Sequence, residues 1–173
     1  MKFNYYAFKA IYLHEMDRFR RTLMQSLLSP VLSTSLYFIV FGSVIGGYVQ
    51  KIDGISYGSY IVPGLLMLTL LTQSISNTSF GIFFPKFNGT IYEILAAPIS
   101  TLEIVLAFVG AGATKTLIVG CMIFITSTFF VEVEVQFPIL MIFLLVLVSF
   151  TFALFGFLIG LMSSNFEQMS IIP

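Results

Sequence analysis

The chain has 173 residues, of which 58% are hydrophobic and only 9% are charged, and its mean hydropathy is +1.01. An ordinary soluble domain carries about 25% charged residues, so this composition excludes one. The formal net charge is zero, but five of the eight lysines and arginines precede the first apolar run: Lys2, Lys9, Arg18, Arg20 and Arg21. The aromatic residues lie mostly inside apolar runs and not among basic residues, so a nucleic-acid partner is also excluded.

Residues 2–22 interleave aromatic and charged side chains. The apolar positions recur at steps of three and four residues, with one glutamate among them: Phe8, Ile11, Tyr12, Glu15 and Phe19. This spacing predicts an amphipathic helix that lies in the membrane interface, with its rings at the headgroup boundary and its cations toward water.

Two membrane-spanning helices are predicted next, over residues 27–49 and 60–84. Pro30 falls in the first turn of the former, where a missing N–H does no harm. Pro63 and Gly64 are expected to break up the start of the latter, and a polar patch follows at residues 72–79. Such a patch is costly in lipid, so it should face other helices or an aqueous path. Four of its residues are candidates to line that path: Thr72, Gln73, Ser76 and Asn77.

The third and fourth spans are predicted within residues 104–130 and 137–162, joined by a short acidic loop that contains Glu132 and Glu134. The lysines and arginines that flank the spans lie on the same side of the membrane as the N-terminus, except Lys51, which lies on the other side. The positive-inside rule therefore places the N-terminus and residues 85–103 and 163–168 in the cytoplasm. The fold expected is an all-α polytopic membrane bundle with four spans.

Lys115 lies inside the third apolar stretch and allows two interpretations. In the favoured one, the true span begins near Thr114, residues 104–113 form an interfacial approach, and the lysine snorkels to the cytoplasmic face. In the other, Lys115 is a buried functional residue.

Apolar character resumes after Gln168 and the chain ends at Pro173. Residues 163–173 are therefore expected to form a cytoplasmic loop and the start of a fifth span.

The sequence lacks the residue patterns of several kinds of catalytic and transport protein. His14 is the only histidine, and no HExxH, GxSxG or Walker A pattern occurs. Catalysis by this chain, or a cofactor bound by it, is not expected, and any ATP-driven work would need a partner. No internal repeat of the secondary-transporter kind and no TVGYG-like filter is present.

The loop after the second span contains a turn glycine, a short amphipathic segment and a proline stop. Residues 89–100 read Gly-Thr-Ile-Tyr-Glu-Ile-Leu-Ala-Ala-Pro-Ile-Ser, and Glu103 follows. This segment resembles the pattern found after the second span of the ABC-2 type export permeases, the membrane subunits of bacterial ABC exporters. The basic end of residues 2–22 and the Pro63-Gly64 pair are also similar to that family.

The resemblance implies six spans in each permease half, a homodimer in the bacterial inner membrane, and a separate ATPase subunit. It implies that the loop is a coupling helix that docks on the ATPase, through Gly89, Thr90, Glu93, Leu95 and Pro98. It also implies that residues 2–22 form a gating helix, with Arg18, Arg20 and Arg21 near the ATPase or lipid headgroups.

Two functions stay open at this point. The first is the permease of an ATP-driven exporter, whose substrate could equally be a sugar, a lipid or an amphipathic drug. The second is a membrane scaffold or assembly subunit, in which the polar patch only packs helices.

Overall fold

The computed structural model describes residues 3–45, 51–52, 55–131, 133 and 135–171. The helices are α1 Tyr5–Arg21, α2 Leu23–Tyr37, the π-helix η1 Phe38–Ile45, α3 Tyr57–Asn88, α4 Ile91–Ala96, α5 Thr101–Phe130, α6 Pro138–Met162 and α7 Phe166–Ile171. Strands β1 Lys51–Ile52 and β2 Ile55–Ser56 form a two-residue antiparallel ladder between η1 and α3. Among the described residues, four helices are long and apolar enough to cross a membrane. The predicted all-α membrane bundle is confirmed.

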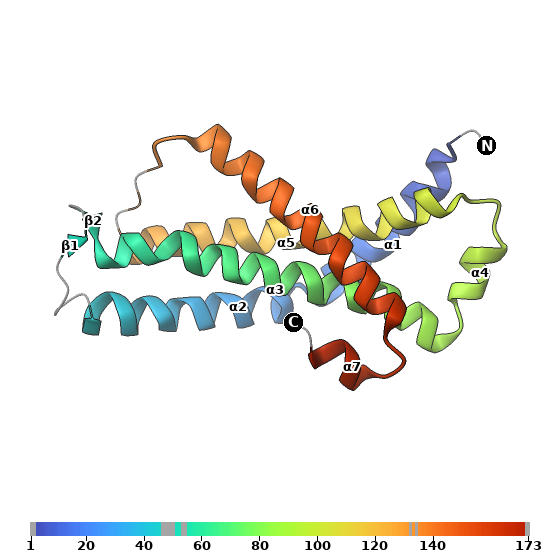
Figure 1. The fold of residues 1–173 in the computed structure, drawn as a ribbon, viewed down its shortest axis with the longest axis horizontal. Coiled ribbons are helices and arrows are strands. Elements are labelled where there is room, and N and C mark those ends of the chain that lie inside the picture. The colour runs from blue at the N-terminus through green and yellow to red at the C-terminus, as the bar shows by residue number, and fades with distance from the viewer. Residues whose placement is uncertain (1–2, 46–50, 53–54, 132, 134, 172–173) are drawn as a thin grey trace.

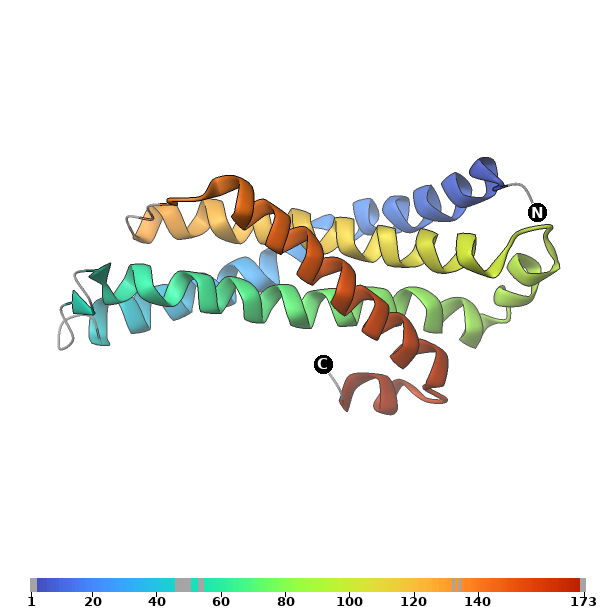
Figure 2. The same ribbon diagram turned by 45° about the horizontal axis from the view of Figure 1, so that its top comes forward.

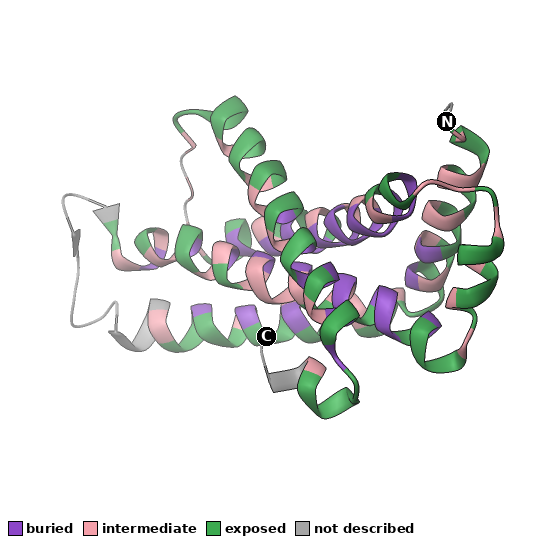
Figure 3. Ribbon diagram, turned by 45° about the vertical axis from the view of Figure 1, so that its right-hand side comes forward, coloured by how far each residue is buried: buried purple, intermediate pink, exposed green. Residues whose placement is uncertain are grey.

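Helix α5 is the centre of the bundle. Its apolar window is 61% buried, against 17–28% for the other three candidate spans. Figure 3 shows buried positions along α5 and on the faces that α1 and α3 turn toward it, while much of α2 and α6 is exposed. Helix α6 crosses α3, and α2 lies beside the second half of α5 (Figures 1 and 2). The outward leucines and phenylalanines of α2 and α6 suit a lipid environment.

The two ends of the bundle carry different connections. The N-terminus and α4 lie at one end, toward which α6 also descends before α7. The β1–β2 ladder and the connection from α5 to α6 lie at the other end (Figure 1). The segments assigned to one side of the membrane from the positions of lysine and arginine therefore lie toward one end. Glu132 and Glu134 of the acidic loop lie outside the described residues.

Two prolines do not act as expected. Helix α3 is continuous from Tyr57 to Asn88, so Pro63 and Gly64 do not break it, and that prediction is wrong. Helix α2 begins at Leu23, so Pro30 lies inside it and not in its first turn. Membrane helices tolerate such prolines where neighbouring helices and side-chain hydroxyls satisfy the freed backbone groups.

Capping residues set the limits of α3 and α5. The Ser56 side chain accepts a hydrogen bond from the Ser59 N–H and starts α3, and Gly89 ends it with a φ of 79°. Such a left-handed conformation favours glycine. Ser100 and Glu103 form a capping box that starts α5. Helix α5 is then one unbroken helix to Phe130, and the prediction that the span begins near Thr114 stays a prediction.

Candidate functional site

Helix α1 packs along the first half of α5, and the two helices run in the same direction. The Asn4 N–H donates to Glu103 Oε1 at 2.5 Å, and the Tyr12 hydroxyl donates to Thr114 Oγ1 at 3.0 Å. Further along, Phe19 is 5% exposed. The helical face predicted to meet lipid headgroups therefore packs on α5. The placement of α1 in the membrane interface stays a prediction.

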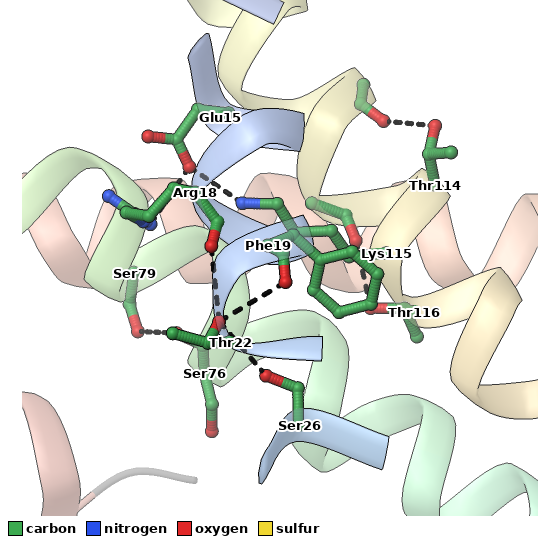
Figure 4. Close-up of polar contacts among 12 residues, drawn as sticks. Glu15, Arg18, Phe19, Thr22, Ser26, Ser76, Ser79, Thr114, Lys115 and Thr116 are labelled. Atoms are coloured by element: carbon green, nitrogen blue, oxygen red, sulfur yellow. Dashed lines mark hydrogen bonds and ion pairs between the residues drawn. The ribbon is translucent and has the colours of Figure 1, made fainter. Parts of the chain in front are cut away.

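A buried ion cluster joins α1 to α5. Glu15 Oε2 lies 2.7 Å from Lys115 Nζ and 2.9 Å from an Arg18 guanidinium nitrogen. The side chains of Glu15 and Lys115 are 3% and 4% exposed, and that of Arg18 is 26% exposed. Figure 4 shows both cations directed at the same carboxylate. Lys115 therefore does not snorkel, and the favoured prediction is wrong: a carboxylate from another helix compensates its charge inside the bundle.

Helix α3 completes the surroundings of this cluster. The Arg18 guanidinium lies over the Phe80 ring, 5.3 Å from its centroid, which is cation–π geometry. The next residue, Gly81, allows close approach: a Cβ there would lie 3.3 Å from Glu15 Oε2. The ion cluster therefore sits where α1, α3 and α5 meet.

A pocket of about 250 Å³ adjoins the cluster. Its wall contains two cations, four neutral polar side chains and two aromatic rings: Arg18, Lys115, Thr22, Gln25, Ser26, Asn77, Phe19 and Phe80. Thr22 and Ser26 lie at the junction of α1 and α2, where the Thr22 hydroxyl bonds the carbonyls of Arg18 and Phe19 (Figure 4). Among the described residues, no carboxylate lines this wall.

The structure divides the predicted polar patch between two faces of α3. Ser74, Thr78 and Ser79 are buried, and the Ser74 hydroxyl donates to the Ser149 carbonyl of α6 at 2.6 Å. These residues pack helices. The four candidate path residues are half-buried or exposed: Thr72, Gln73, Ser76 and Asn77.

Only one of the four candidate path residues, Asn77, lines the pocket, and its amide donates to Gln73 at 3.3 Å. The Thr72 hydroxyl bonds carbonyls of its own helix. The assignment of all four residues to a translocation path stays a prediction.

The three predicted gating arginines also do not lie together. Arg18 belongs to the ion cluster and the pocket, whereas Arg20 and Arg21 are exposed.

The residues predicted to couple to an ATPase lie at the end of the bundle that holds α4. Thr90, Glu93, Leu95 and Pro98 are exposed, and Gly89 is half-buried. Helix α4 has no buried residue. Among the described residues, the Glu93 carboxylate makes no ion pair. Ile91 and Ile94 pack against the core, so one face of α4 lies on the bundle and the face that carries Glu93 and Leu95 is exposed.

Sequence reasoning missed the role of Glu15. It is a single carboxylate on the apolar face of residues 8–19, and Lys115 is a single cation in an apolar span. Two isolated opposite charges of this kind need compensation. That signal could have predicted the pair.

Comparison with known proteins identifies the chain. Residues 6–173 match the model of the family described as ABC-2 type transporter. The chain is 37% identical over 167 residues to proteins called "Inner membrane transport permease YadH" from Escherichia coli K12, Escherichia coli O157:H7 and Shigella flexneri. The alignments cover 96% of this chain and 65% of each relative, so the chain spans about two thirds of their length. No solved structure matches. The chain belongs to the ABC-2 type transporter family.

Proposed function

We propose that this chain forms the permease part of an ATP-driven exporter and that residues 85–103 form the coupling segment that docks on a separate ATPase subunit. The observation that carries the proposal is helix α4, which has no buried residue and exposes both charged and apolar side chains at one end of the bundle. Tyr92 is 72% exposed and Leu95 is 63% exposed. Exposed aromatic and aliphatic side chains around a charge are typical of a protein-binding surface.

The connections of α4 suit it to pass on a movement. Gly89 forms a tight turn directly after α3, and the Ser100–Glu103 capping box starts α5 four residues after α4 ends. Glu103 also accepts the Asn4 N–H, which joins the start of α5 to the start of α1. A push on α4 from an ATPase would therefore act on α1, α3 and α5 together, and so on the helices that surround the pocket.

The remaining parts of the proposal follow from the family and from the charges. The chain has no Walker A motif, so a partner must hydrolyse ATP. The basic end of the bundle faces the cytoplasm of a bacterial inner membrane, with lipid around α2 and α6. Two permease copies form a homodimer, and Thr72, Gln73, Ser76 and Asn77 face the translocation path.

Affinity purification from native membranes tests the docking surface. The wild-type permease should recover an ATPase with a Walker A motif, identified by mass spectrometry. Leu95→Ala and Glu93→Lys should each lower the recovered ATPase by about fivefold or more, because both change an exposed contact surface. Leu32→Ala is the matched control: Leu32 is 59% exposed on α2, away from α4, and should leave recovery unchanged.

A stable permease that transports without any ATPase would contradict the proposal. Recovery of an unrelated assembly in place of an ATPase would instead favour the scaffold interpretation.

A further inference from the structure

We propose that the pocket between the α1–α2 junction, α3 and α5 binds an anionic phosphate group, such as the headgroup of a phospholipid. This inference goes beyond the proposed function and does not depend on it, because it concerns a binding site within the permease itself.

The wall of the pocket has an excess of positive charge. Arg18 and Lys115 both line it, while Glu15, their shared partner, does not. Both cations contact the same carboxylate oxygen, so one negative charge serves two positive charges. Lys115 is buried and Arg18 is 26% exposed, so the excess positive charge lies at the side of the pocket that solvent reaches and attracts an anion there. A bound anion would supply the missing charge.

The wall also has hydrogen-bond donors to spare. An ammonium group has three N–H donors and a guanidinium has five. The described residues give Lys115 Nζ one acceptor, Glu15 Oε2, which Arg18 also uses. Beside them are the amide groups of Gln25 and Asn77, and the Asn77 amide uses one of its two N–H groups on Gln73. The hydroxyls of Thr22 and Ser26 already donate within the α1–α2 junction. A phosphate offers several strong acceptor oxygens and suits a fork of arginine donors.

The size and position of the pocket favour a headgroup over a whole drug-like molecule. At about 250 Å³, the pocket is smaller than the roughly 300–1,000 Å³ of typical small-molecule sites. Arg18 lies in the last turn of α1, just before the junction with α2, whose first residue Leu23 begins the first candidate span. That is the level at which phospholipid headgroups lie when α2 crosses a bilayer. The Phe19 and Phe80 rings provide an apolar wall beside the cations.

Binding of soluble short-chain lipids to the purified permease in detergent tests the proposal. Dihexanoyl phosphatidic acid should bind and raise Tm, and dihexanoyl phosphatidylcholine, whose phosphate is neutralised by choline, should bind at least about tenfold more weakly. Inorganic phosphate, added as a competitor, distinguishes the sources. Competition at similar concentration assigns the site to free phosphate, and competition only at far higher concentration assigns it to a lipid headgroup.

A variant that keeps the fold makes the test specific. Gln25 is exposed at the pocket and outside the ion cluster, so Gln25→Glu adds one negative charge without removing a buried contact. It should weaken phosphatidic acid binding by about tenfold while Tm without ligand stays the same. Gln168→Glu makes the same change at an exposed site of α7 and should bind as wild type does.

Three results would overturn the proposal: no binding of either anion, equal binding of the two lipids, or wild-type binding by Gln25→Glu. Recovery of the ATPase is measured separately, so failure here leaves the proposed function standing, and the reverse also holds.

Discussion

Glu15 and Lys115 lie 100 residues apart in the chain, and each is the isolated charge of its apolar surroundings. Their contact at 2.7 Å replaces the water that either group would otherwise require. Arg18 shares the same carboxylate oxygen but is more exposed, so it can reach solvent if the carboxylate is lost. Lys115 cannot, because its side chain is only 4% exposed. Loss of the Glu15 carboxylate would therefore leave Lys115 without a counter-charge.

Removal of that carboxylate should destabilise the protein strongly. We expect Glu15→Ala to lower the free energy of unfolding by about 3–5 kcal/mol, because Lys115 would be left as an unpaired buried charge. The double variant Glu15→Leu with Lys115→Met should recover much of the loss, since an apolar pair of similar volume needs no counter-charge. Thermal unfolding in detergent, followed by size-exclusion chromatography, measures both changes.

Asp17→Ala provides the control, because Asp17 is an exposed acidic residue on the same helix. It should change stability by less than about 0.5 kcal/mol. If Glu15→Ala behaves like Asp17→Ala, the ion cluster does not hold α1 in place.

At the scale of elements, the packing of α6 on α3 depends on two glycines one helical turn apart. A Cβ at Gly156 would lie 2.5 Å from the Ile75 carbonyl oxygen, and a Cβ at Gly160 would lie 2.5 Å from the Ser79 carbonyl oxygen. Both contacts are with backbone, which cannot rotate away as a side chain can. Small residues spaced by four allow membrane helices to approach closely and gain van der Waals contact.

Substitution of Gly156 by alanine should therefore separate α6 from α3. We expect Gly156→Ala to lower stability by about 1–3 kcal/mol, the usual cost of overpacking a tight contact. Gly64→Ala is the matched control within α3, because a Cβ there has no heavy atom within 4 Å. That change should be neutral or stabilise by up to about 1 kcal/mol through helix propensity. The melting temperatures of the two variants test this prediction. Equal values would show that the close approach of α6 to α3 does not contribute to stability.

At the scale of the whole molecule, the proposed function depends on which segments lie at each end of the helical bundle. Helix α4 lies at the same end as the N-terminus, and Gln136 lies in the connection between α5 and α6 at the other end. If the basic end is cytoplasmic, these two exposed positions lie on opposite sides of the membrane.

Cysteine labelling in intact cells checks this orientation. In a Cys121→Ser background, a membrane-impermeant maleimide should label Gln136→Cys and should label Leu95→Cys only after the cells are permeabilised. Leu95 and Gln136 are both exposed, so a difference in labelling reports the side of the membrane and not burial. The reverse pattern would contradict the proposed cytoplasmic N-terminus.

Much of this organisation can be predicted from the sequence. The thickness of the bilayer sets the length of a span, and each span forms a helix because backbone polar groups exposed to lipid are costly. Runs of apolar residues therefore identified the four long helices found among the described residues. The turn at Gly89 and the capping residues Ser100 and Glu103 are local signals, and they act as local rules require. The prediction that Pro63 breaks the helix was wrong. The rule that proline breaks a helix describes helices in water and does not include the packing that supports a membrane helix.

The candidate site was less predictable, since its residues come from α1, α2, α3 and α5. The polar patch was recognised, but not that Ser74 and Thr78 would pack helices while Asn77 would face a pocket. That division depends on the rotation of α3 against its neighbours, which no single segment encodes.

The sequence by itself determined the class of protein, the number of long apolar helices and the family segment at residues 89–100, because each depends on composition or local order. Only the tertiary structure decided that Glu15 compensates Lys115 and that α1 packs on α5. The physical reason is that a buried charge can be neutralised by any suitable partner in the chain, and the choice of partner is made by how the helices pack.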